Sequence, residues 1–241
     1  TATTAPIEND EPEAQAEDNE NISFIGSDLP EDEGFTGFNF SQFGERFSQD
    51  PIANSIAVIV LLGMIGLVVW IGIQFMQANT HKTWPDWILP VLLVIGLGIA
   101  IYLATVEVSG GEAICGPVGD CNAVQESEYS KVFGIPVAVL GMIGYIIIGA
   151  SWIVARLKDG MTAFYAKMAM FLFSLFGLLF FIYLTFLEPF VIGATCAWCI
   201  SSAIIFSLIN LYTTPVALNA WAEIEVDMDD DDDDYDDEGN A

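Results

Sequence analysis

Positive charge is scarce in this chain of 241 residues, which contains six Lys and Arg residues against 33 Asp and Glu residues. It also has only one histidine and four cysteines. Hydrophobic residues make up 54% of the chain, and the mean hydropathy is +0.52. This composition excludes an ordinary soluble domain and indicates a membrane protein with short loops.

The acidic residues responsible for the net charge of −27 lie mostly at the two ends of the chain. Residues 1–50 contain 13 of them, and residues 215–241 contain 12. The first segment has almost nothing to bury, and the last includes an uninterrupted run of aspartates whose like charges repel one another. We therefore expect acidic disordered tails over 1–50 and over 214–241.

Five apolar segments between the tails are each close to the ~20 residues that cross the hydrocarbon core of a bilayer. Phe40, Phe43 and Phe47 recur at helical spacing before the first segment, which predicts a short aromatic helix in the headgroup region. The sequence thus predicts an all-α polytopic membrane protein. Its spans are expected at about 52–76, 87–106, 136–154, 164–187 and 196–212.

Basic residues near the span ends predict the orientation, because Lys and Arg are enriched in cytoplasmic loops. An outside N-terminus and a cytoplasmic C-terminus place the loop 107–135 and the turn 188–195 on the outer or periplasmic side of a cell (inner or plasma) membrane. Disulfides persist on that side. In this orientation the outward basic residues are Arg46 and Lys131, and the cytoplasmic ones are Lys82, Arg156, Lys158 and Lys167.

The cysteines form two close pairs, each at the mouth of a predicted span. Cys196 and Cys199 are spaced i, i+3 at a helix start, which puts both sulfurs on one face and Cys196 at the positive end of the helix dipole. Such a position lowers the pKa of a thiol and favours an exchangeable disulfide. Because Cys199 lies about one turn, roughly 5 Å, deeper, we expect Cys196 to face the water and Cys199 the lipid.

The other pair, Cys115 and Cys121, encloses the residues Gly-Pro-Val-Gly-Asp, whose turn conformations allow a small ring in a mobile loop. Asn122 followed by Gln125 three residues later predicts a capped short helix after the ring. That helix would hold the ring close to Cys196. A chain that places all of its thiols in this way is expected to move electrons between them.

Two other roles for the thiols stay open at this point. Four thiolates could hold a structural zinc ion, although Cys-x5-Cys is an awkward spacing and the chain has no second loop rich in ligands. Two inert structural disulfides are also possible, although a bond between positions i and i+3 at one helix end constrains little. We expect no metal at these residues.

Three stretches carry a resemblance to a known family. They are CGPVGDCNAV from Cys115, YSKVFGIPVAVLG from Tyr129 and YLTFLEPFVIGATCAWC from Tyr183. In this order they resemble the prokaryotic branch of the vitamin K epoxide reductase family, over about residues 84–213. The resemblance implies a four-helix catalytic bundle around a quinone. Residues 51–83 lie outside it, as one additional N-terminal transmembrane helix and a loop.

The resemblance also implies the activity, that of a quinone-dependent thiol-disulfide oxidoreductase. A reduced thioredoxin-like or DsbA-like partner attacks Cys115, Cys121 then attacks Cys196, and Cys199 is released beside the quinone. The electrons reach menaquinone or ubiquinone, and the reaction supports disulfide formation in exported proteins. No thioredoxin-like domain follows the last span, so the partner is expected to be a separate protein. No nucleic acid is expected among the partners.

Two alternative functions are retained. A DsbB-type enzyme carries out nearly the same reaction in a four-helix bundle, but its Cys-x-x-Cys pair precedes the spaced pair, whereas here it follows. The alternative from another class is a membrane protein that binds a metal ion through four thiolates. Bound zinc or copper without bound quinone would favour that alternative.

Overall fold

The computed structural model describes residues 44, 47–48, 50–77, 83–115 and 119–238, with side chains described as far as residue 225. The acidic tail expected over 1–50 and its aromatic helix therefore lie almost entirely outside the described residues.

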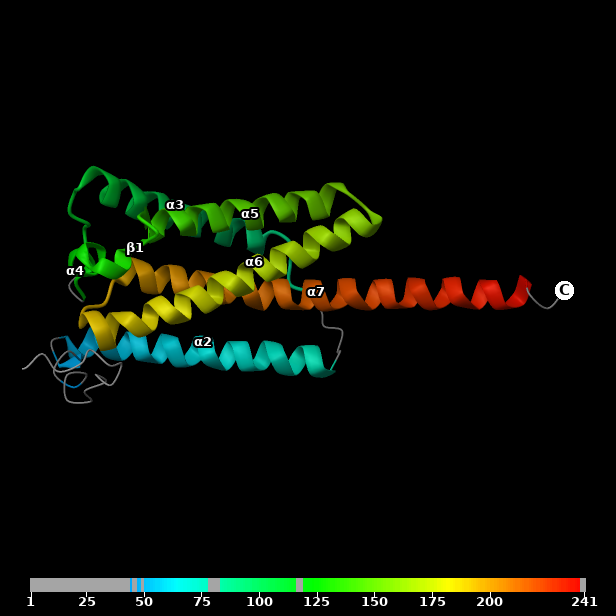
Figure 1. Ribbon diagram of the computed structural model, residues 1–241, viewed down its shortest axis with the longest axis horizontal. Helices are drawn as coiled ribbons and strands as arrows, with labels where there is room; N and C mark the ends of the chain where they lie inside the picture. The colour runs from blue at the N-terminus through cyan, green and yellow to red at the C-terminus, as the bar shows by residue number, and fades with distance from the viewer. Residues whose placement is uncertain (1–43, 45–46, 49, 78–82, 116–118, 239–241) are drawn as a thin grey trace, which may run out of the picture. The chain divides into compact units, whose positions relative to one another are not determined.

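Five long helices dominate the described chain, and each is long and apolar enough to cross a membrane (Figure 1). The first four lie within a few residues of the predicted spans, which confirms an all-α polytopic fold. The π-helical turn η2 (Glu188–Ile192) directly continues the fourth. The five helices are α2 (Pro51–Gln77), α3 (Ile88–Ser109), α5 (Val137–Leu157), α6 (Gly160–Leu187) and α7 (Ala197–Glu238).

The last helix is longer than the span predicted for it at 196–212. α7 continues through Pro215 to Glu238. The segment that was expected to be a disordered tail from residue 214 is therefore helical as far as Glu238. Ala217, Leu218 and Ala220 are buried there. The polar residues just after Tyr212 interrupt the apolar run in the sequence, but packing against the neighbouring helices continues past them.

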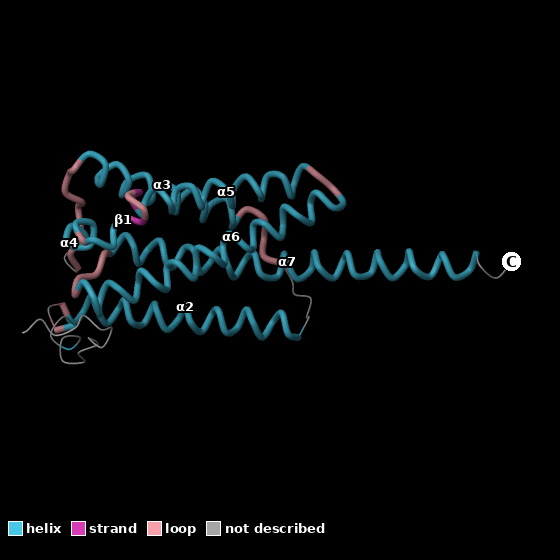
Figure 2. Tube along the Cα trace, in the orientation of Figure 1, coloured by secondary structure: helices cyan, strands magenta, loops and turns pink. Residues whose placement is uncertain are grey.

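Two clusters of buried side chains hold the helices together, and α6 contacts α2, α5 and α7 (Figure 2). Leu89, Tyr145 and Phe206 belong to the first cluster, which joins α3, α5 and α7. Met64 and Leu178 belong to the second, in which α2 packs against α6 and α7. The additional N-terminal helix is therefore part of the packed bundle.

Polar side chains join α6 to α7 inside the bundle. The Asn210 amide nitrogen donates to the Ser174 carbonyl oxygen at 2.9 Å, and the Ser174 and Thr213 hydroxyls lie 2.9 Å apart. All three residues are fully buried. Because hydrocarbon offers no alternative hydrogen-bond partners, these bonds fix the register of α6 against α7.

Short elements follow α3 at one end of the bundle (Figure 1). They are α4 (Cys121–Glu126), the 3-10 turn η1 (Glu128–Ser130), and a hairpin of β1 (Lys131–Val132) and β2 (Ile135–Pro136). The hairpin is antiparallel, with Lys131 opposite Pro136. Its two turn residues, Phe133 and Gly134, both have positive φ, as a tight two-residue hairpin requires.

The opposite end of the bundle carries ion pairs. Arg156 pairs with Asp86, whose carboxylate also accepts a hydrogen bond from the Tyr212 hydroxyl at 3.2 Å. Lys167 lies 3.3 Å from Glu223. Two of the basic residues behind the predicted orientation, Arg46 and Lys82, lie outside the described residues, and the orientation stays a prediction.

Candidate functional site

Cys115 and Cys121 form a disulfide between the end of α3 and the start of α4, with Cα atoms 5.9 Å apart. Cys121 is the first residue of α4 and is fully buried, whereas Cys115 is partly exposed. The Cys121 backbone N–H donates to the Cys115 sulfur at 3.1 Å. A thiol that approaches from the solvent therefore reaches Cys115 before it can reach Cys121.

Asp120, and not Asn122, caps α4. The Asp120 carboxylate accepts the backbone N–H groups of Asn122 and Ala123, both at 3.1 Å. The prediction of an Asn122 cap was wrong because the helix begins at Cys121, which makes the preceding residue the N-cap. Asn122 instead turns back towards the loop that follows α3, where its Oδ1 accepts the N–H of Ala113 at 2.7 Å.

Cys196 and Cys199 are free thiols at the start of α7. The Cys196 carbonyl accepts the N–H of Ile200 at 3.0 Å, so Cys196 is the N-cap of the helix. Its sulfur accepts the Cys199 thiol at 2.6 Å and the Cys199 backbone N–H at 3.3 Å. The hydrogen bond from the Cys199 thiol, helped by backbone N–H groups at the helix start, lowers the pKa of Cys196 although burial opposes it. This is the direction that the sequence predicted.

The position of Cys196 differs from the prediction, which placed it facing the water. Cys196 is fully buried in a cluster that also contains Cys121 and Ala113, while Cys199 is partly exposed. The cause is the disulfide loop, which folds over the start of α7: the Asp120 N–H donates to the Thr195 carbonyl at 3.0 Å. The structure thus brings the two cysteine pairs together, with Cys121 and Cys196 in the middle.

An aromatic pair fixes the backbone just before Cys115. The indole N–H of Trp198 donates to the Ile114 carbonyl at 3.0 Å, and the Ile114 N–H donates to the Tyr102 hydroxyl at 2.8 Å. The centroids of the Tyr102 and Trp198 rings lie 5.2 Å apart. Neither aromatic residue was predicted to support the site, although Trp198 stands between the two cysteines of the second pair and could have suggested it.

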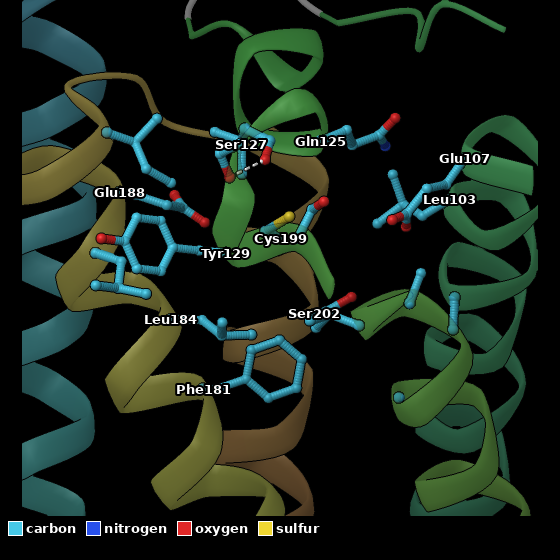
Figure 3. A pocket seen from close by; sticks show the side chains of 18 of the residues that line it. Leu103, Glu107, Gln125, Ser127, Tyr129, Phe181, Leu184, Glu188, Cys199 and Ser202 are labelled. Carbon is cyan, nitrogen blue, oxygen red and sulfur yellow. Dashed lines mark hydrogen bonds between the residues drawn. The ribbon is translucent and has the colours of Figure 1, made fainter. Parts of the chain in front are cut away.

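A cavity of about 90 Å³ lies beside Cys199, among α3, α4, α5, α6 and α7 (Figure 3). Cys199 and Ser202 come to its wall from α7, Phe181 and Leu184 from α6, and Leu103 from α3. Its wall is mainly apolar, which suits a ligand with a hydrophobic body. The apolar part of the wall comprises Leu103, Val137, Ala138, Gly141, Phe181 and Leu184 among others.

A few polar groups face this apolar cavity. The Glu107 Oε1 and Gln125 Nε2 atoms are buried and have no hydrogen-bond partner within the described part of the chain. Glu188 is also buried, and its Oε2 accepts the backbone N–H of Cys196 at 3.2 Å. The sequence predicted none of these three residues at the cavity, because they meet there only when the helices pack. Gln125 was expected only to help cap the short helix after the ring.

A membrane-spanning helical bundle in which two cysteine pairs meet beside an apolar cavity defines a class of proteins built for disulfide exchange. Residues 87–214, slightly more than half of the chain, match the family model for the Vitamin K epoxide reductase family, and the chain belongs to that family. The resemblance predicted from the sequence is thereby confirmed. The helix α2 precedes the matched residues.

One curated relative is the thiol-disulfide oxidoreductase LTO1 of Arabidopsis thaliana. It is 33% identical over an alignment of 128 residues, and this alignment covers 48% of this chain and 33% of the relative. The matched segment therefore spans about a third of that relative. No solved structure matches the chain.

Proposed function

We propose that this chain is a quinone-dependent thiol-disulfide oxidoreductase, which passes electrons from a thioredoxin-like dithiol protein to a quinone in the membrane. The observation that carries the proposal is the buried contact cluster of Cys121 and Cys196, with Cys199 on the wall of an apolar cavity. Membership of the family supports the same reading.

The first exchange would take place at the exposed side of the disulfide. A thiolate of the partner attacks the Cys115 sulfur, the Cys115–Cys121 bond breaks, and Cys121 leaves as a thiolate. The second thiol of the partner then attacks the mixed disulfide and releases Cys115. The partner ends as a disulfide, and both electrons now reside on the first cysteine pair.

The second exchange would take place inside the buried cluster. The Cys121 thiolate attacks Cys196 of an oxidised Cys196–Cys199 pair, and Cys199 leaves as a thiolate. Cys115 then attacks Cys121, which restores the first disulfide and frees Cys196. The product is the arrangement in the structure, with Cys115 bonded to Cys121 and two free thiols at the start of α7.

In this proposal the quinone binds in the cavity beside Cys199. Its volume of about 90 Å³ is several times the roughly 10–15 Å³ that one water needs on this measure, and its apolar wall suits a ring and an isoprenoid tail. The unpartnered Gln125 Nε2 is a donor for a ring carbonyl. A bound quinone, whether menaquinone or ubiquinone, would accept the two electrons and two protons lost when Cys196 and Cys199 close to a disulfide.

Side chains of this protein would prepare that last step. The Cys199 thiol donates its hydrogen bond to Cys196, so the Cys196 sulfur is the one held ready as a thiolate. Glu188 holds the Cys196 backbone and also lines the cavity, where a carboxyl group can pass a proton. Cys199 lines the cavity and Cys196 does not, so we assign the quinone contact to Cys199.

The test uses the purified full chain in lipid nanodiscs, with a reduced thioredoxin-like protein as donor and ubiquinone or menaquinone as acceptor. Quinone absorbance should fall with the wild-type protein. Cys199→Ser should abolish the fall, while Cys196 still forms a mixed disulfide. Ser207→Ala is the control and should behave as the wild type, because the Ser207 hydroxyl donates to the Ala203 carbonyl within α7. Turnover by the Cys199→Ser protein would show that the assignment of roles is wrong.

In a cell, the same direction of electron flow would support disulfide formation in exported proteins. That proposal adds the outward placement of the cysteine pairs, since disulfides persist outside the cytosol. Loss of disulfides from exported proteins in a strain that lacks this chain, restored by the wild-type gene and not by a Cys199→Ser copy, is the expected result. Exported proteins that stay fully oxidised without the chain would contradict it.

A further inference from the structure

We propose that the start of α2 is part of the electron-transfer site, although this helix lies outside the segment that matches the family. Asp50 and Asn54 are positioning residues, which hold the disulfide loop over Cys196 so that Cys121 can attack it. The inference rests on the proposed function, because it assumes that electrons pass between the two pairs.

Asp50 connects the first turn of α2 to the disulfide loop. Its Oδ1 accepts the N–H of Ala53 at 3.2 Å and caps the helix, while its Oδ2 accepts the N–H of Gly119 at 3.0 Å. Gly119 lies two residues before Cys121 and is separated from Asp50 by 69 positions in the sequence. One carboxylate therefore ties the additional helix to the loop that carries the reactive disulfide.

The loop lies very close to the start of α7 at this point. Gly119 has φ +87°, a conformation that favours glycine, and a Cβ atom there would collide with the Thr195 carbonyl oxygen and meet the Ala53 side chain. Three segments of the chain thus converge at Gly119, Thr195 and Ala53. A small outward shift of the loop would separate Cys121 from Cys196.

Asn54 holds the other side of this contact. It is fully buried, its Oδ1 accepts the Thr195 hydroxyl at 2.8 Å, and its Nδ2 donates to the Phe47 carbonyl at 3.1 Å. Thr195 directly precedes Cys196, and its carbonyl accepts the N–H of Asp120, which directly precedes Cys121. The two cysteines that must react therefore each follow a residue whose position depends on the start of α2.

The chemistry explains why such a clamp is useful. Thiol-disulfide exchange requires the attacking sulfur to reach bonding distance, and a glycine-containing loop left free would spend most of its time elsewhere. Holding the loop keeps the Cys121 sulfur close to the Cys196 sulfur. A misplacement of reacting atoms by about 1 Å can lower a rate by about 100-fold. The buried Asn54 amide, paired with the Thr195 hydroxyl, and the Asp50 carboxylate, paired with the Gly119 N–H, together serve this purpose.

The experiment measures the internal exchange directly. In the Cys115→Ser/Cys199→Ser background, Cys121 and Cys196 are the two cysteines left, and the rate at which they cross-link under mild oxidation reports how well the loop is held. Asp50→Ala/Asn54→Ala should slow this cross-link by about 10- to 100-fold. Ser55→Ala is the matched control, because its hydroxyl bonds within α2 to Pro51, and it should leave the rate unchanged.

Single variants separate positioning from folding. Asp50→Asn keeps one oxygen to cap the helix, so it loses only one of two bonds and should slow the cross-link without lowering the thermal midpoint. Thr195→Val removes the hydroxyl and keeps the carbonyl, and it should add little to Asn54→Ala, because both break the same bond. The same substitutions are also made with all four cysteines present and Cys115 bonded to Cys121. In these proteins a small alkylating reagent should reach Cys196 faster than it does in the wild type.

The outcomes distinguish this inference from the proposed function. If the background variant does not cross-link even with Asp50 and Asn54 in place, the exchange between the pairs is absent and the proposed function fails. If it cross-links at the same rate with and without these residues, or slows only as far as the protein unfolds, the positioning role of α2 is wrong while the relay stands.

Discussion

In the proposed relay, the two cysteines that react with each other are Cys121 and Cys196, and these are the two that are fully buried. Their partners Cys115 and Cys199 are partly exposed. Cys115 would be open to a protein donor, and Cys199 lines the apolar cavity. Burial of the middle pair keeps foreign thiols away from the internal exchange. The family resemblance implied these roles for the four cysteines, but the burial of Cys121 and Cys196 was not predicted, because spacing alone gives no burial.

The residue pair that exchanges can be trapped. With Cys115 and Cys199 both replaced by serine, Cys121 and Cys196 have no competing thiol, and a stable cross-link should accumulate under mild oxidation. Protease cleavage in the loop at 158–161, followed by electrophoresis without reductant, should keep the two halves joined, and reductant should separate them.

The complementary variant tests the assignment of the two loop cysteines. Cys121→Ser/Cys199→Ser should cross-link far more slowly, because Cys115 lies on the exposed side of the loop. If this variant cross-links and the first does not, Cys115 is the internal attacker. If neither cross-links, the relay between the pairs is refuted.

The lowered pKa of Cys196 predicts a pH dependence. The hydrogen bond from residue 199 stabilises the thiolate, so Cys196 stays deprotonated at lower pH than an ordinary thiol. Cys199→Ala removes this donor and should move the thiolate titration, followed by ultraviolet absorbance, to higher pH. Cys199→Ser keeps a hydroxyl donor and should lie between alanine and the wild type. Equal midpoints for the two variants would show that the hydrogen bond does not set the pKa.

At the scale of the elements, the apolar runs predicted the ends of four of the five long helices to within a few residues. The fifth helix was predicted too short. Thr213, Thr214 and Pro215 end the apolar run in the sequence, but the helix continues past them because it packs against its neighbours. The clamp at the start of α2 was not predicted at all. Asp50 and Asn54 look like ordinary residues at the end of a span, and only long-range packing brings them to Gly119 and Thr195.

Close contact between α3 and α5 predicts an effect of one glycine. A Cβ at Gly96 would occupy the space of the buried Tyr145 ring, so Gly96→Ala should destabilise the bundle by about 1–3 kcal/mol, as overpacking does. Because Tyr145 also lines the cavity, the KM for quinone should rise. The thermal midpoint in detergent and quinone kinetics measure the two effects.

The same helix supplies the control. Nothing lies within 4 Å of a Cβ placed at Gly98, two residues along α3, so Gly98→Ala should be neutral or slightly stabilising. Equal effects of the two substitutions would mean that helix propensity and not the contact with Tyr145 decides the outcome.

At the scale of the whole molecule, all four cysteines lie at one end of the bundle, and the Arg156–Asp86 and Lys167–Glu223 pairs lie towards the other. The enrichment of Lys and Arg in cytoplasmic loops predicts that the cysteine end is outside. A membrane-impermeant thiol reagent applied to intact, reduced cells should therefore label Cys115.

A reporter on the other side makes this result decisive. In a variant with all four cysteines replaced by serine, Asp159→Cys places a single thiol in the loop between α5 and α6. It should react only after lysis. Labelling of this thiol in intact cells, together with no labelling of Cys115 in intact cells that carry the wild-type protein, would reverse the orientation.

The hydrogen bonds between α6 and α7 also bear on how the protein is made. With Asn210 and its neighbours inside it, α7 is the least apolar of the five spans and the most enclosed by the others. Alone in a bilayer it would expose polar groups to lipid, so we expect its insertion to depend on α6, which precedes it directly in the chain. The Cys196 and Cys199 pair sits at the start of this dependent helix. We therefore expect the dithiol site to assemble only when the rest of the bundle is in place. An unfinished chain would then have no site that could pass electrons to another acceptor.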